Sequence, residues 1–186
     1  GKTSRDEKRV VENKKDEIEI LNSEIKRAND TIGIKKTFIY NFADNRFDSV
    51  DLLDIVKVIS KVKEEIKPDV IFTHYEKDLN IDHQITYKAV IIATRPMQNE
   101  SVKEIYSFEV LSSTEWNYPL TFSPDTFFDI EDTLDLKISA MKEYKSELCT
   151  YPHPRSIEGI ELNAKYQGMR VGKKYVEAFK SVRVIR

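Results

Sequence analysis

Residues 70–94 change from a strand pattern to a helix pattern across a polar loop, and this change constrains the fold more than any other feature. Residues 70–72 (VIF) form a short apolar run, which is typical of a buried strand. Apolar side chains recur at helical spacing over residues 85–92. A polar loop between two such core elements belongs at the carboxyl edge of a sheet, where open α/β folds place their functional residues. The pattern therefore predicts a functional site within residues 73–84, which read THYEKDLNIDHQ.

Helix and strand patterns alternate along the first part of the chain. The predicted order is helix 5–31, strand 36–42, helix 49–66, strand 69–73, helix 82–94 and strand 101–111. Gly33 is expected to end the first helix, and Asp48 is expected to cap the second. This order predicts an α/β fold with a parallel sheet flanked by helices. A length of 186 residues suits one domain spanning residues 1–186.

The remainder of the chain carries weaker patterns. We predict a short strand at residues 126–129, a helix over 134–148, and a last short strand at 182–185. Residues 157–179 have a helical pattern that is interrupted near Gly168 and Gly172.

Composition excludes several classes of protein. A net charge of −2 and a pI near 6.0 provide no basic surface for nucleic acid. No apolar run approaches the roughly 20 residues that span a bilayer, and the polar start GKTSRDEKR lacks the apolar region of a signal peptide. A single cysteine, Cys149, permits no internal disulfide. We therefore expect a cytoplasmic protein.

The polar loop contains His74 and His83, two of the three histidines, together with Asp78 and Asp82. One interpretation makes Asp82 a helix N-cap and His83 an ordinary surface or core histidine. The other makes His83 a metal ligand through its neutral imidazole, with a carboxylate nearby to orient it. His74 favours the second interpretation because it ends the preceding strand and both rings can face one cleft. Asp78 is left open as a ligand, a residue that orients a ligand, or a loop acid.

Two further segments carry candidate binding residues. Arg46 lies in a polar loop after the strand predicted at 36–42, where it would hold a phosphate or a sugar hydroxyl, or simply pair with a neighbouring aspartate. His153 and Arg155 lie in YPHPRS, where prolines restrict the backbone. That restriction suits a ligand-binding loop, and it is also typical of an ordinary structured loop.

Other catalytic schemes find little support. The chain has no GxSxG, Walker or GxGxxG motif and only five glycines, which disfavours a nucleotide-binding α/β protein. Cys149 follows an amphipathic pattern and is expected to pack as a small apolar residue rather than to act as a nucleophile.

Several motifs in order resemble one family. They are DNRFD at 44–48, THYEKDLNIDHQ at 73–84, ATRP at 93–96, YPHPRS at 151–156, Gly168, and YVEAF at 175–179. The chain resembles the PIG-L/LmbE-like zinc de-N-acetylases, which include the N-acetylglucosaminyl-phosphatidylinositol deacetylase. The resemblance implies a Rossmann-like fold and zinc as cofactor. It also implies that the chain as given begins after the family's first βαβ unit.

The resemblance assigns His83 to the zinc. In that family a His and an Asp of an early HPDDE motif complete the ligand set, and another acid of that motif is the general base; this chain has no match to the motif. Asn80 stands where thiol-biosynthesis relatives have a histidine that assists the oxyanion. Asp82, His74 and Asn80 are therefore the expected catalytic residues here, with Asp82 orienting His83 or the start of its helix.

The resemblance also implies the substrate class. We expect removal of an N-acetyl group from an amino sugar, with Arg46, Asp78, His153 and Arg155 as candidate substrate contacts. The chain as given is expected to be inactive, because one imidazole does not hold catalytic zinc. The alternative is a non-catalytic fragment or degenerate relative that binds a sugar or forms an oligomer. An exposed sheet edge would favour a homo-oligomer in either case.

Overall fold

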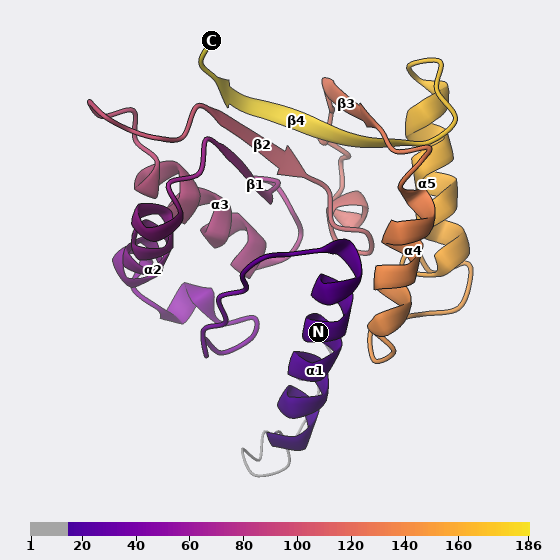
Figure 1. The fold of residues 1–186 in the computed structure, drawn as a ribbon, viewed down its shortest axis with the longest axis horizontal. Helices are drawn as coiled ribbons and strands as arrows, with labels where there is room; N and C mark the ends of the chain where they lie inside the picture. Colours follow the sequence, from indigo (N-terminus) through magenta and orange to yellow (C-terminus); the bar gives the residue numbers. More distant parts are fainter. Residues whose placement is uncertain (1–14) are drawn as a thin grey trace. The chain divides into compact units, whose positions relative to one another are not determined.

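The computed structural model describes residues 15–186. Its elements follow in the order α1 (Lys15–Ile32), η3 (Phe47–Ser49), α2 (Leu52–Ile66), β1 (Val70–His74), α3 (Ile81–Ala93), β2 (Glu104–Phe108), η4 (Thr114–Trp116), β3 (Thr126–Asp129), α4 (Leu134–Glu143), α5 (Ile157–Met169) and β4 (Val176–Val184) (Figure 1). Residues 1–14, where the first predicted helix begins, lie outside the described part. None of the described helices combines the length and hydropathy needed to cross a bilayer.

The four strands form one sheet in the order β1-β2-β4-β3. Strand β1 pairs with β2 in parallel, whereas β2 pairs with β4 antiparallel. The α/β class and the strand at Thr126–Asp129 are confirmed. The prediction of a parallel sheet is wrong for β4, which runs antiparallel to β2. The direction of a strand depends on the end of the sheet from which the chain enters it, and local side-chain alternation does not report this.

Two predicted elements differ most from the structure. Residues 35–43 belong to no strand, although the segment is rich in β-branched and aromatic side chains. A strand requires a backbone partner as well as local propensity, and no strand in the described part pairs with this segment. The helical pattern at 157–179 divides into α5 and β4, with Gly172 in a left-handed turn at φ +71° between them.

The described chain divides into two compact units. One contains the described residues up to Ile39 together with Phe128–Glu177, and the other contains Tyr40–Phe127 and Ala178–Arg186. In the first unit α1 packs on α4, and the buried Glu24 carboxylate accepts hydrogen bonds from the Ser146 backbone N–H (3.1 Å) and hydroxyl (2.6 Å). Gly33, at φ +78°, ends α1 as predicted.

The second unit contains β1, β2, α2 and α3. Helices α2 and α3 pack side by side, as Figure 1 shows, and their core consists of Ile55, Val56, Ala89 and Ala93. A second cluster of Val90, Val102 and Ile105 attaches α3 to β2. This packing fixes the amino end of α3 close to the carboxyl end of β1, since α3 also contacts that strand.

Candidate active site

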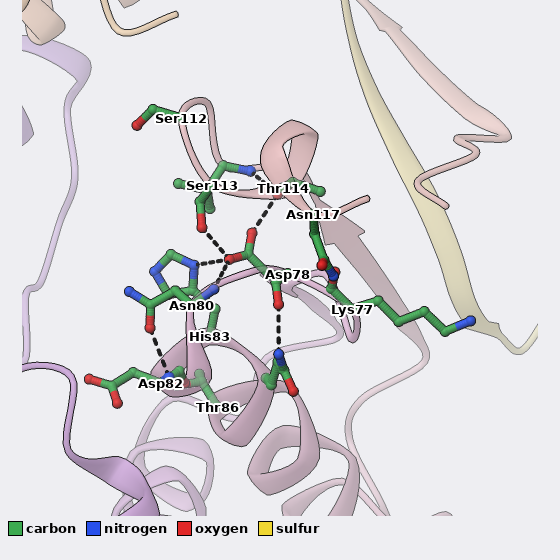
Figure 2. A network of polar contacts seen from close by, with 12 residues as sticks. Lys77, Asp78, Asn80, Asp82, His83, Thr86, Ser112, Ser113, Thr114 and Asn117 are labelled. Atoms are coloured by element: carbon green, nitrogen blue, oxygen red, sulfur yellow. Dashed lines mark hydrogen bonds and ion pairs between the residues drawn. The ribbon is translucent and has the colours of Figure 1, made fainter. Parts of the chain in front are cut away.

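The candidate site lies at the carboxyl ends of β1 and β2, entirely within the second unit. Because these strands are parallel, the loop that follows each of them starts from the same edge of the sheet. The loop after β1 leads into α3, and the loop after β2 contains η4. Figure 2 shows the side chains of both loops meeting around Asp78.

Asn80 is the N-cap of α3. Its backbone is extended (φ −77°, ψ 124°), and its side-chain oxygen accepts the Asp82 backbone N–H at 2.8 Å. This bond provides a partner for one of the N–H groups of the first turn, which have no partner within the helix. The cap is thus Asn80, whereas the first interpretation of the sequence had placed Asp82 there. With its oxygen engaged, the Asn80 amide retains N–H donors.

Asp78 is the centre of the polar network. Its side chain is 0% exposed, and the Oδ1 atom accepts hydrogen bonds from His83 Nδ1 (2.9 Å), the Asn80 backbone N–H (2.8 Å) and the Ser113 hydroxyl. The Oδ2 atom accepts a hydrogen bond from the Thr114 hydroxyl. A buried carboxylate is costly unless its oxygens are hydrogen-bonded, and here both oxygens are (Figure 2).

These contacts determine the ionisation of Asp78. Burial raises the pKa of the carboxyl, but hydrogen bonds from His83, Ser113 and Thr114 oppose this and lower the pKa from 3.8 to about 2. The group is therefore a carboxylate at neutral pH.

His74 and His83 lie face to face. Their ring centroids are 4.2 Å apart with planes inclined by 18°. Burial is the main cause that lowers the pKa of His74 to about 4, and the charge of His83 adds to it. His74 is therefore neutral at pH 7, and its Nδ1 atom is buried without a hydrogen-bond partner. The strand end and the helix start together form a stacked imidazole pair. That both rings face one cleft stays a prediction.

Asp82 is directed away from His83 and toward a different loop. Its carboxylate accepts the Asn45 backbone N–H at Oδ2 (2.7 Å) and the Phe47 backbone N–H at Oδ1 (2.9 Å). These two bonds enclose Arg46, whose own side chain is exposed. The DNRFD and DH motifs are thus joined through Asp82, although 37 residues separate Asn45 from Asp82.

His153 and Arg155 belong to the other compact unit. The Nδ1 atom of His153 accepts the Arg155 backbone N–H at 3.1 Å, and the Arg155 guanidinium forms an ion pair with Glu147. The adjacent Ser156 caps α5 by accepting the Gly159 backbone N–H at 2.9 Å. Their role as substrate contacts remains a prediction.

A metal ion would find one suitable ligand in this network. A histidine whose Nδ1 atom is hydrogen-bonded to a buried carboxylate has the arrangement usual for metal-binding histidines, so His83 fits. Across residues 15–186, however, no three His, Cys, Asp or Glu side chains are grouped so that they could hold a metal ion together. The described residues therefore fit part of a metal site.

Sequence reasoning missed Ser113 and Thr114. Both are buried, at 9% and 4% exposure, and both donate to Asp78. A signal was present, because hydroxyl residues follow β2 at the same edge of the sheet where the residues after β1 had been singled out.

Comparison with known proteins matches the segment that contains this loop. The sequence profile of the PIG-L family, described as GlcNAc-PI de-N-acetylase, matches residues 1–94, which include the loop with Asp78 and His83. This chain belongs to the PIG-L family.

The chain is 26% identical over 141 residues to a probable N-acetyl-α-D-glucosaminyl L-malate deacetylase 2 of Bacillus cereus, covering 75% of this chain and 63% of that protein. It is 29% identical over 129 residues to the uncharacterized deacetylase YaiS of Escherichia coli, covering 66% and 64%. The chain thus spans less than two thirds of the length of these curated relatives.

Solved structures share the PIG-L fold of this chain. The conserved protein TT1542 of Thermus thermophilus superposes with a TM-score of 0.73 at 20% identity, covering 90% of this chain and 75% of that one. The N,N'-diacetylchitobiose deacetylase of Pyrococcus horikoshii gives 0.65 at 21% identity, covering 88% and 63%. A deacetylase of the teicoplanin biosynthesis pathway gives 0.66 at 16% identity, covering 90% and 74%. At these identities the likeness establishes the fold alone.

Proposed function

We propose that this chain carries part of the active site of a zinc-dependent hydrolase that removes an N-acetyl group from an amino sugar. The observation that carries the proposal is the pairing of His83 with the buried Asp78 at the start of α3. It lies within the segment that the family profile matches. Relatives named as deacetylases of N-acetylated sugars support the substrate class.

In this proposal His83 holds the zinc through Nε2, since Nδ1 is engaged by Asp78. A zinc ion held there would polarise the amide carbonyl and activate the attacking water. Asn80 supplies an amide N–H to the oxyanion that develops at the carbonyl. His74, neutral and stacked on His83, supplies a proton-transfer group beside it. The net reaction consumes water and releases acetate and a free amine.

Substrate contacts are assigned to the loop that Asp82 holds. Arg46 is exposed between two backbone groups bonded to that carboxylate, which suits a hydrogen-bond donor for a sugar hydroxyl or phosphate. His153 and Arg155 are also proposed as substrate contacts. The rigidity that Asp82 gives to the Arg46 loop is the physical reason to prefer this segment, because a preordered loop loses less entropy on binding.

We further propose that residues 1–186 alone do not catalyse the reaction. Catalytic zinc sites use three protein ligands, and His83 is the candidate identified among the described residues. The alternative function is a non-catalytic sugar-binding or oligomerising relative of the deacetylases.

Zinc analysis of the purified chain separates these possibilities. Near-stoichiometric zinc that is lost in His83→Ala, together with release of acetate from N-acetylglucosamine conjugates, would indicate an assembled enzyme site. Absence of zinc and of acetate release, with sugar binding retained in calorimetry, would support the binding relative. A wild-type zinc content that survives in His83→Ala would overturn the assignment of His83.

A further inference from the structure

We propose that Asp78, held by Ser113 and Thr114, is the positioning residue that sets the tautomer and the orientation of His83. That this orientation serves zinc binding rests on the proposed function. The contacts of Asp78 do not depend on it. These contacts join the loop after β1 to the loop after β2, a connection of 35 and 36 residues along the chain. They assign Ser113 and Thr114 a place in the site, although the sequence patterns predicted no role for either residue.

The hydrogen-bond inventory determines the tautomer. The two hydroxyl groups and the Asn80 backbone N–H all donate to the Asp78 carboxylate. The carboxylate therefore acts only as an acceptor, and the imidazole nitrogen 2.9 Å from its Oδ1 atom must donate. His83 accordingly has a proton at Nδ1, so in the neutral ring the lone pair belongs to Nε2, on the side of the ring opposite Asp78 (Figure 2).

The orientation is fixed from several directions. The Asp78 backbone is held by its N–H, which donates to the Tyr75 carbonyl at 3.1 Å, and by its carbonyl, which accepts from Gln84 Nε2 at 2.7 Å. The ring of His83 is also stacked on His74. An imidazole bound on one edge and one face has little rotational freedom, so its Nε2 lone pair keeps one direction before any ligand arrives.

This arrangement explains why Asp78 lies so deep. A carboxylate with 0% side-chain exposure and both oxygens bonded offers no free atom to a sugar. We therefore assign Asp78 to positioning His83 in place of the substrate contact that the sequence suggested. Ser113 and Thr114 hold the carboxylate, since without them its oxygens would lose two of their donors in a buried place.

Nitrogen-15 NMR of the metal-free chain tests the tautomer directly. The wild type should show His83 protonated at Nδ1 with a non-protonated Nε2 at pH 7.5. Asp78→Asn, which keeps the shape and removes the charge, should produce a mixture of tautomers. The double variant Ser113→Ala/Thr114→Val should free the intact Asp78 carboxylate to turn away from the ring, so a mixture of tautomers is expected there too. This variant is the test if Asp78→Asn fails to fold by circular dichroism.

The matched control is Asn117→Ala. This variant removes the bond from Asn117 Nδ2 to the Lys77 carbonyl (2.8 Å), which joins the same two loops without touching Asp78. It should leave the His83 tautomer unchanged. A wild-type His83 protonated at Nε2, or a tautomer unaffected in the folded Asp78 and Ser113/Thr114 variants, would overturn the inference.

Zinc titration provides a second measurement. If the wild type binds Zn²⁺, Asp78→Asn should weaken the affinity about 10- to 100-fold, as loss of a group that orients a metal ligand usually does. If the wild type binds none, the non-catalytic relative is favoured over the enzyme, while the tautomer result still decides the inference. The two failures are therefore distinguishable.

Discussion

At the scale of single residues, the two aspartates of the DLNIDH segment have different tasks. Asp78 is directed toward His83, and Asp82 accepts backbone N–H groups from Asn45 and Phe47. Their spacing of four residues does not place them on one face of a helix, because α3 begins at Ile81, after the first of them. The same residue type therefore orients a side chain in one case and a loop in the other.

Replacing Asp82 should loosen the Arg46 loop. Asp82→Asn keeps one acceptor but turns an N–H group toward a backbone donor, and the buried carboxylate loses its charge-assisted bonds. We expect a loss of roughly 1–3 kcal/mol in the free energy of unfolding, measured by urea denaturation. Faster amide exchange at Asn45 and Phe47 should accompany it. The exposed Asp48→Asn in the same loop is the control, and equal losses in both variants would contradict this role for Asp82.

Asp125 should contribute a pH-dependent part of the stability. Its carboxylate accepts hydrogen bonds from Lys180 Nζ (2.6 Å) and the Ser181 backbone N–H (2.7 Å). Burial raises the pKa of Asp125, but these bonds outweigh it and lower the pKa from 3.8 to about 2. A folded-state pKa below the unfolded value stabilises the protein above about pH 4, and this stabilisation disappears as the pH falls through about 2.

The variant Asp125→Asn tests this dependence. Because Asp125 and Lys180 are 39% and 44% exposed, solvent screens the pair, so we expect a loss of roughly 0.5–1 kcal/mol at pH 6. The difference from the wild type should narrow as the pH falls below 4. Urea denaturation over this pH range measures it, with the exposed Asp132→Asn as control. A difference that is constant with pH would argue against the carboxylate as its source.

At the scale of elements, packing decided what local patterns left ambiguous. The helix and strand around residues 70–94 were predicted within one or two residues, since each has a strong period of its own. The segment 36–42 is also rich in strand-forming side chains, but no strand among the described residues pairs with it. Only the last part of the helical pattern at 157–179 is strand, because β4 pairs with β2 there and pairing and burial outweigh propensity.

Gly168 in α5 should not tolerate a side chain. A Cβ atom there would lie 2.5 Å from the Lys173 carbonyl oxygen and 2.8 Å from that of Lys174, both of which are backbone atoms. We expect Gly168→Ala to lower the free energy of unfolding by roughly 1–3 kcal/mol through overpacking, despite alanine's higher helix propensity. Thermal denaturation measures it, with the exposed Tyr166→Ala in the same helix as control. A stabilised Gly168→Ala protein would contradict this prediction, because it would show that the backbone after α5 shifts to make room for the added methyl group.

At the scale of the whole molecule, β1 lies at the end of the strand order. Within residues 15–186 its second edge has no strand beside it, and Phe72 on this strand is 47% exposed. Exposed strand edges with apolar side chains favour pairing between chains.

The organisation as a single domain stays a prediction.

We accordingly expect the purified chain to self-associate. Light scattering coupled to size-exclusion chromatography should give a mass that rises with concentration above the 21.7 kDa of one chain. Dilution and moderate urea should reduce that mass before the helices unfold. A constant monomer mass over a wide concentration range would contradict the homo-oligomer proposed from the exposed edge.

The sequence by itself determined the α/β class, the location of the candidate site between β1 and α3, and the family. It could do so because strand and helix periods, caps and contiguous motifs are local properties. The tertiary structure alone decided that β4 runs antiparallel, that residues 36–42 form no strand, and that Asp78 meets Ser113 and Thr114. These features depend on segments about 35 or more residues apart, whose meeting is set by how the whole chain packs and not by any local pattern.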